Sequence, residues 1–212
     1  RDYREAVNNY DQAIRLNAPA TDYAQFQRAV MLGLLDQRDR KIESLRDIIS
    51  SGKGDYVDDA MYELGRTYVQ TERFNDGAAV LKRLTATYPE SPYYLPALSQ
   101  LGLTYQNLGN GNEALRYYKQ IVAEFPSSRQ AKDAMLSIRN IYVDNNDVDS
   151  YVRGIIQGHG YGPYFTHGLG HGIGMGDGEL PLLNAGSDTV LEEGMIMSCE
   201  PGIYVPGLGG VR

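Results

Sequence analysis

A pattern of residue types that returns at a fixed interval constrains this chain more than any other feature of its sequence. The segment Leu64–Tyr68 places Leu, Gly and Tyr at helical spacing, and Leu101–Tyr105 repeats those residue types 37 residues later. Ile138 and Tyr142 continue the interval. A period in this range is typical of helical pairs that stack on their neighbours, because one pair alone cannot bury its apolar face.

Each repeat also contains the residues that a second helix and its end require. Apolar residues at three- and four-residue spacing precede the pairs Tyr88–Pro89 and Phe125–Pro126, where proline ends the helix. Gly65 and Gly102 would let the paired helices approach closely. The pattern predicts helices near residues 3–16, 22–35, 38–50, 57–70, 74–87, 94–107, 111–123 and 129–144.

These residue types and this period resemble the tetratricopeptide repeat. The resemblance implies a mainly α-helical solenoid that binds protein or peptide segments. Tyr93, Tyr94, Tyr117 and Tyr118 would pack between helices or line the concave face. A plain helical bundle is the alternative fold. The Tyr-Pro and Phe-Pro closures are similar to those of bacterial envelope repeat proteins, which implies an envelope-associated or periplasmic setting for this part.

The composition changes abruptly near residue 153. Residues 153–212 contain 16 of the 24 glycines and all three histidines, but only two of the 20 basic residues. We therefore expect two domains, a helical array at 1–152 and a second segment at 153–212. The array is expected to begin and end inside a repeat, because Gly154 would interrupt the helix that residues 146–151 begin.

The glycine-rich run Tyr164–Met175 leaves three chemical interpretations open. A phosphate-binding loop would need a helix after the run, and the glycines and proline that follow disfavour one. A helical zinc-binding pair would be broken by the glycines between His167 and His171. The third interpretation is a metal site on extended strands, with the carboxylate of Glu200 arriving from a neighbouring strand at Met195–Cys199.

Five short motifs favour the third interpretation by their order and spacing. They are His167–Gly174, Glu179–Pro181, Leu191–Met195, Glu200–Tyr204 and Gly209–Arg212. Together they resemble the C-terminal part of the pita-bread metallopeptidases, the group of Xaa-Pro aminopeptidases and prolidases. The resemblance implies a short, glycine-rich, β-containing segment of a partial pita-bread fold. It also implies amide hydrolysis with Mn, Co, Fe or Zn, and a cytoplasmic setting.

The resemblance assigns roles to three residues. His171 and Glu200 would be metal ligands, and His167 would hydrogen-bond the substrate and stabilise the tetrahedral intermediate. The family has three more ligands: two upstream aspartates, one of them in an Asp-x-Thr context, and a glutamate after Gly-Val-Arg. A further histidine would stand where Gly178 does, and the sequence provides none of these groups.

The remaining titratable residues of this region receive no metal role. Asp144, Asp147 and Asp149 lack the family context and are interpreted as a polar turn, and His159 has no motif around it. Catalytic zinc sites generally use three protein ligands. Because the sequence supplies two, we predict no cofactor with certainty for this chain alone. Without the other strands of the sheet, part of 153–212 is expected to be irregular or mobile.

Three functions follow from these observations. The first is a protein-interaction scaffold that carries an incomplete metal-site segment. The second is a metal-dependent Xaa-Pro aminopeptidase or dipeptidase whose remaining ligands come from outside this chain, and the third is an artificial or mis-assembled fusion. A net charge of −7 argues against nucleic acid as the main partner. The sequence contains no run of about 18 apolar residues, so no membrane span is predicted.

Overall fold

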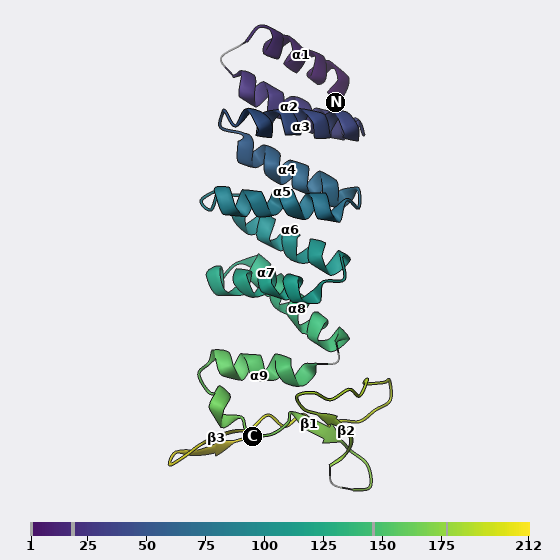
Figure 1. Ribbon diagram of the computed structural model, residues 1–212, viewed down its shortest axis with the longest axis vertical. Helices are drawn as coiled ribbons and strands as arrows, with labels where there is room; N and C mark the ends of the chain where they lie inside the picture. Colours follow the sequence, from purple (N-terminus) through teal and green to yellow (C-terminus); the bar gives the residue numbers. More distant parts are fainter. Residues whose placement is uncertain (1, 18–19, 146, 177) are drawn as a thin grey trace. The chain divides into compact units, whose positions relative to one another are not determined.

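The computed structural model describes residues 2–17, 20–145, 147–176 and 178–212. The chain separates into two compact units, Arg1–Met135 and Leu136–Arg212, and the division falls inside helix α8 (Arg129–Asp144). The first unit is built from helices, and the strands of the described residues lie in the second (Figure 1).

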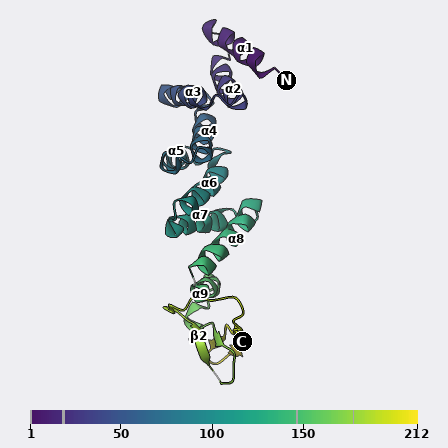
Figure 2. The same cartoon turned by 90° about the vertical axis from the view of Figure 1, so that its right-hand side faces the viewer.

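The first unit is a series of antiparallel helices in which each helix packs on the next. Figure 2 shows α3 and α5 on one side of this series and α2 and α6 on the other. The helices are α1 (Tyr3–Arg15), α2 (Thr21–Leu34), α3 (Arg38–Ser51), α4 (Val57–Gln70), α5 (Phe74–Thr87), α6 (Tyr94–Asn107) and α7 (Gly111–Glu124). The predicted helical solenoid is confirmed, and the predicted bounds differ from these by a residue or so.

Glycine sets how closely the two helices approach in the α4–α5 and α6–α7 pairs. A Cβ atom on Gly65 would lie 2.6 Å from Cγ of Leu81, and one on Gly102 would lie 2.5 Å from Cε1 of Tyr118. Contacts this short are not tolerated in packed interiors. The close approach predicted from the small residues is therefore confirmed for both pairs.

Polar and aromatic contacts join the repeats to one another. The rings of Tyr62 and Tyr93 stack with centroids 4.9 Å apart. The Tyr93 hydroxyl donates to Oδ1 of Asp59 at 2.7 Å, and Ser91 donates to Oδ2 of Asp58 at 2.6 Å. Because ionisation would break its hydrogen bond to Asp59, the pKa of Tyr93 is raised to about 12. Burial raises the pKa of Asp59 above its ordinary value.

The tyrosines predicted to pack between helices do so. Tyr117 and Tyr118 are buried, and Tyr105 stacks on Tyr117 with centroids 5.7 Å apart. Tyr94 lies against Phe125 at 6.1 Å between centroids. These rings contribute to the contact between successive helices in the second half of this unit.

The second unit combines helix with short strands. Its elements after α8 are α9 (Val148–Gly158), the 3₁₀ turn η1 (Gly162–Tyr164), β1 (Gly170–Gly172), β2 (Glu179–Leu183), β3 (Ile203–Val205) and β4 (Gly209–Val211). β1 pairs antiparallel with β2, and Gly170 lies opposite Leu183. β3 pairs antiparallel with β4, and Ile203 lies opposite Val211.

Two expectations for the second unit were wrong. Gly154 does not end a helix, because α9 continues through it to Gly158, and residue 146 of the predicted start lies outside the described residues. One helical glycine costs about 1 kcal/mol, which tertiary contacts can offset. The predicted strand at Met195–Cys199 is reduced to an isolated bridge between Met197 and Gly172, flanked by hydrogen bonds from the Ile173 amide to the Ile196 carbonyl at 2.9 Å and from the Ser198 amide to the His171 carbonyl at 2.8 Å.

In the part of the chain that is described, we find no helix with the length and apolar character needed to cross a bilayer.

Candidate functional site

The two residues predicted as metal ligands lie together in the second unit. Nε2 of His171, on β1, is 3.2 Å from Oε1 of Glu200, and its Nδ1 is 2.8 Å from the carbonyl oxygen of Gly172. The His171 amide donates to Oγ of Ser198 at 2.9 Å, and the Ser198 amide donates back to the His171 carbonyl at 2.8 Å. This reciprocal contact brings the 198–200 segment alongside β1.

His167 lies near this pair and has a different set of partners. Its Nδ1 is 2.7 Å from the Gly168 carbonyl oxygen, and its Nε2 is 3.2 Å from the hydroxyl of Tyr204 on β3. The ring of Phe165 meets the imidazole edge to face at 5.4 Å. Tyr204 was noted in sequence only as part of a motif, and its contact with His167 adds it to the site.

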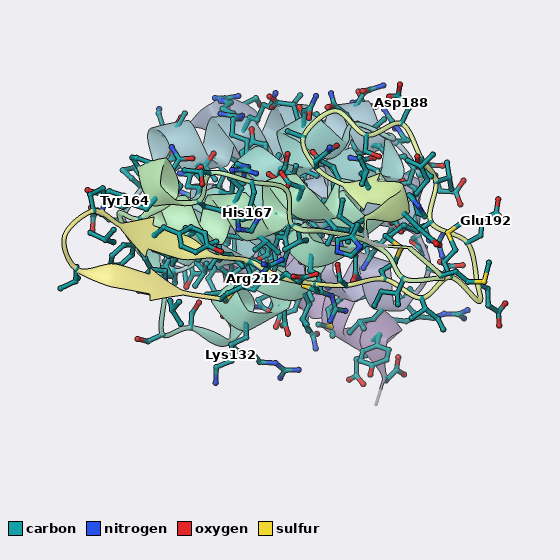
Figure 3. All side chains as sticks on the ribbon, turned by 90° about the horizontal axis from the view of Figure 1, so that it is seen from below. Lys132, Tyr164, His167, Asp188, Glu192 and Arg212 are labelled. Carbon is teal, nitrogen blue, oxygen red and sulfur yellow. The ribbon has the colours of Figure 1, made fainter. Side chains whose placement is uncertain are left out.

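Arg212 pairs with the second oxygen of the Glu200 carboxylate. Its Nη2 forms an ion pair with Oε2 of Glu200, while His171 faces Oε1. A cavity of about 300 Å³ lies here, and Figure 3 labels His167 and Arg212 on this unit. The cavity is lined by His167, Gly168, Gly170, His171, Gly178, Leu182, Asn184, Glu200 and Arg212.

The described residues bring few metal donors to this cavity. Among the described residues, no group of three or more His, Cys, Asp or Glu side chains is placed to hold an ion. His171 and Glu200 supply one nitrogen and one carboxylate. Gly178 lines the cavity and brings no side chain. Two donors are fewer than the three protein ligands of a typical catalytic zinc site.

The interpretation of Asp149 as part of a polar turn was wrong, because Asp149 lies inside α9 and is buried. Asp147 is the N-cap of α9 and accepts a hydrogen bond from the Ser150 amide at 3.3 Å. Asp149 is 2% exposed and forms an ion pair with Arg153 at 3.1 Å. Its Oδ1 also accepts from the Leu169 amide at 3.0 Å. The Asp-x-x-x-Arg spacing is the sequence signal that could have identified this pair.

His159 follows α9 as its C-cap residue. Its side chain is exposed and does not line the cavity. It therefore stays without a role.

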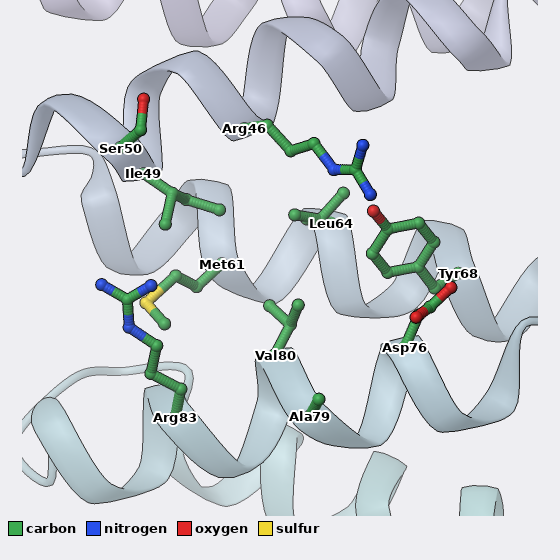
Figure 4. A pocket seen from close by; sticks show the side chains of 10 residues that line it. All are labelled: Arg46, Ile49, Ser50, Met61, Leu64, Tyr68, Asp76, Ala79, Val80 and Arg83. Atoms are coloured by element: carbon green, nitrogen blue, oxygen red, sulfur yellow. The ribbon is translucent and has the colours of Figure 1, made fainter.

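The first unit contains a groove that the sequence did not predict. It has a volume of about 380 Å³ and lies between α3 and α5, above α4 (Figure 4). Ile49, Met61, Leu64 and Val80 supply apolar surface. The groove is lined by Arg46, Ile49, Ser50, Met61, Leu64, Tyr68, Asp76, Ala79, Val80 and Arg83.

Two arginines give the groove its charge. Figure 4 shows Arg46 and Arg83 at opposite ends, with the apolar side chains between them. The guanidinium of Arg46 lies 5.7 Å from the centroid of the Tyr68 ring. Asp76 is already paired with Arg73 at 2.5 Å. Within the described ranges neither Arg46 nor Arg83 forms an ion pair, so both cations are available to a ligand.

Comparison with protein families finds two matches. The tetratricopeptide repeat model matches residues 59–91 and 96–128, and the model of metallopeptidase family M24 matches residues 125–212. The second match begins upstream of residue 153 and includes α8 and α9. The predicted domain boundary near residue 153 therefore stays a prediction, and the family match itself starts at residue 125.

Dipeptidase relatives match the C-terminal part of the chain. A putative dipeptidase of Bacillus subtilis, YkvY, is 48% identical over 83 residues, which are 39% of this chain and 23% of that protein. The Xaa-Pro dipeptidase of Lactobacillus helveticus is 49% identical over 84 residues, 40% of this chain and 23% of that protein. The chain thus spans about a quarter of the length of these relatives.

Solved structures match the helical array. The crystal structure of MamA superposes with a TM-score of 0.57 and 20% identity, over 68% of this chain and 80% of that one. YrrB, described as a tetratricopeptide protein with an unusual peptide-binding site, gives a TM-score of 0.54 and 19% identity over 68% and 70%. At this identity the likeness shows the fold. The chain therefore carries tetratricopeptide repeats at residues 59–91 and 96–128, followed by a segment of metallopeptidase family M24 at residues 125–212.

Proposed function

We propose that this chain is a protein-interaction scaffold whose helical array binds an extended peptide segment and that its C-terminal segment carries an incomplete metal site. The groove between α3 and α5 is the observation that supports the first part. Its volume of about 380 Å³ is within the range of ligand sites, and it needs no group from outside the chain.

The chemistry of the groove defines the peptide. An apolar side chain would contact Met61, Leu64 and Val80 between the two ends of the groove. Carboxylates on either side of it would meet Arg46 and Arg83, because guanidinium groups bind carboxylates with two parallel hydrogen bonds. The ligand is therefore a short segment with a Leu- or Met-type residue between acidic residues. YrrB, which is described as having an unusual peptide-binding site, has a similar fold.

Fluorescence anisotropy with labelled peptides tests this assignment. The probes are Glu-Glu-Leu-Glu-Glu and Lys-Lys-Leu-Lys-Lys peptides and a Glu-Glu-Ala-Glu-Glu peptide that lacks the apolar side chain. We expect the acidic Leu peptide to bind best, and its affinity to fall about tenfold in each of Arg46→Met and Arg83→Met. Arg129→Met is the matched control, because the Arg129 side chain is 91% exposed and does not line the groove.

Two outcomes would contradict the proposal. One is equal affinity of the wild type and the Arg46→Met/Arg83→Met variant for the acidic peptide. The other is a preference for the basic peptide. Because paired charges lose attraction in salt, a correct assignment also predicts weaker binding as ionic strength rises.

A second candidate function rests on the contact between His171 and Glu200. In this alternative the C-terminal segment is part of a metal-dependent Xaa-Pro dipeptidase or aminopeptidase, as the names of its relatives imply. His171 and Glu200 would hold Mn, Co, Fe or Zn, which would supply an activated water, and His167 would contact substrate. Further carboxylates would have to come from outside this chain.

Hydrolysis of an Xaa-Pro dipeptide in the presence of MnCl₂ distinguishes the two candidates. The scaffold proposal predicts no turnover by this chain. Metal-dependent turnover that disappears in His171→Ala, while peptide binding to the array is unchanged, would instead establish the peptidase alternative.

A further inference from the structure

The ion pair between Asp149 and Arg153 connects α9 to the segment that carries the site residues. Both oxygens of Asp149 face Arg153, at 3.1 Å from Nε and 3.2 Å from Nη2. Oδ1 also accepts from the Leu169 amide at 3.0 Å. A carboxylate that is 2% exposed requires such partners, because burying an unpaired charge is costly.

Arg153 extends this contact to two main-chain carbonyls. Nη1 donates to the carbonyl oxygen of Phe165 at 2.9 Å, and Nη2 donates to that of His167 at 3.0 Å. The guanidinium also lies 4.3 Å from the centroid of the Phe165 ring. Since the five N–H groups of arginine have a fixed planar arrangement, these contacts fix the positions of the two carbonyls relative to α9.

Leu169 transmits this arrangement to the predicted ligands. It is fully buried, and its amide points to Asp149 and also donates to the Leu183 carbonyl at 2.6 Å. Its own carbonyl accepts from the Glu200 amide at 2.7 Å. Asp149 is therefore one residue away from the backbone contact that places Glu200 opposite His171.

We infer that Asp149 and Arg153 are positioning residues of the peptidase-like segment. They hold the main chain from Phe165 to Leu169 and thereby orient His167 and align Glu200 with His171. In this inference α9 helps to position the site residues of the segment. It does not depend on what the helical array binds.

An ion pair at this spacing could instead serve only to stabilise its own helix. Arg129 and Asp133 on α8 are such a pair, with 3.8 Å between them and side chains 91% and 67% exposed. Exposed pairs of this kind contribute little to stability. The Asp149–Arg153 pair differs because it also forms three hydrogen bonds with the 165–169 main chain.

Nuclear magnetic resonance of the full chain tests the inference with two readouts. One is hydrogen exchange at the amides of Leu169 and Glu200. The other is the nuclear Overhauser effect between the rings of His167 and Tyr204, whose centroids lie 5.6 Å apart. In Asp149→Asn, which keeps an oxygen acceptor but no charge, we expect exchange at Leu169 to become about tenfold faster and the ring contact to weaken.

Two comparisons separate positioning from helix stability. The exchanged pair Asp149→Arg/Arg153→Asp can restore an ion pair within α9, but it places no acceptor for the Leu169 amide and no donor for the carbonyls. We therefore expect it to restore the α9 amide signals without restoring protection at Leu169. Asp133→Asn, the matched control, is expected to change neither readout.

The inference is overturned if the exchanged pair restores both readouts, or if Asp149→Asn changes neither. Should Asp149→Asn unfold the segment, Arg153→Lys provides the same test, because it keeps the charge and loses the planar fork. It is expected to retain α9 and to lose protection at Leu169 about tenfold. Full protection in that variant would equally overturn the inference.

Discussion

Replacement of Gly102 by alanine tests the close approach of α6 and α7 directly. The new Cβ atom would lie 2.5, 2.7 and 2.9 Å from Cε1, Cζ and Cδ1 of Tyr118. The ring has little freedom to move away, because Tyr118 is 6% exposed and its hydroxyl donates to Oε1 of Gln106 at 2.5 Å. The buried ring of Tyr118 or the backbone of α6 must therefore shift.

Two opposing contributions determine the size of the effect. Removing glycine from a helix interior stabilises by about 1 kcal/mol. Overpacking costs about 1–3 kcal/mol, and contact with three atoms of an anchored ring places Gly102→Ala near the upper end. The net expectation is a loss of about 2 kcal/mol in the free energy of unfolding.

Gly154→Ala is the matched control, since it makes the same chemical change inside another helix. A Cβ atom at Gly154 would meet no heavy atom within 4 Å. With no overpacking to oppose it, this variant is expected to stabilise α9 by about 1 kcal/mol. The two glycines should therefore respond with opposite signs.

Urea denaturation followed by far-ultraviolet circular dichroism measures the overall change. Amide hydrogen exchange reports α6 and α9 separately, which matters because the two glycines lie in different units. A double variant, Gly102→Ala/Tyr118→Leu, should recover part of the loss, because leucine leaves room for the new methyl group. Equal or greater stability of Gly102→Ala relative to the wild type would refute the reasoning.

Three further predictions concern charge. Glu63→Ala should destabilise the chain by about 2 kcal/mol in urea denaturation, because it leaves the buried Lys41 ammonium without its partner at 2.6 Å. A urea midpoint equal to that of the wild type would contradict this. The folded-state pKa of Tyr93, about 12, lies above the ordinary 10.0, so its contribution to stability is complete below pH 10 and is lost as the pH rises from about 10 to about 12. Tyr93→Phe, which removes the hydroxyl that binds Asp59, should lose less stability over that interval, and an identical alkaline loss would show that another group is responsible. Calorimetric titration with MnCl₂ should show no tight binding of two ions per chain, and a stoichiometry of two would show that acidic groups outside the described cavity take part.

The fold of the first unit could be predicted because its determinants are local. Leu101 and Ile121 are fully buried, as their helical spacing predicted, and Gly102 approaches Tyr118 as its size predicted. In a repeat array each helix contacts its neighbours in sequence, so a correct period places the core residues without knowledge of distant contacts. The groove was missed because it depends on how Arg46 and Arg83 project from separate helices, which no single period specifies.

The second unit was harder to predict because long-range contacts override local preference. Glycine at 154 and 158 disfavours a helix, yet α9 forms, and the Asp149–Arg153 pair ties it to residues 165–169. That pair has the spacing of an ordinary exposed ion pair, so the sequence gives no sign that Asp149 is buried. No local period could place His171 and Glu200 together, since 29 positions separate them; the strand-borne metal-site interpretation and the family resemblance that favours it did so.

Charge balance at Glu200 supports our proposal that the metal site of this segment is incomplete. Two divalent cations would bring four positive charges, whereas the described lining of the cavity includes one carboxylate, that of Glu200, beside the imidazoles of His167 and His171. Arg212 adds a positive charge against the second oxygen of that carboxylate. A cation could use both oxygens of Glu200 only if Arg212 moved away, and repulsion between two cations would then be opposed by a single negative charge. The ion pair with Arg212 gives Glu200 a partner without a metal, and under our proposal further carboxylates would have to join this site before it could hold two cations.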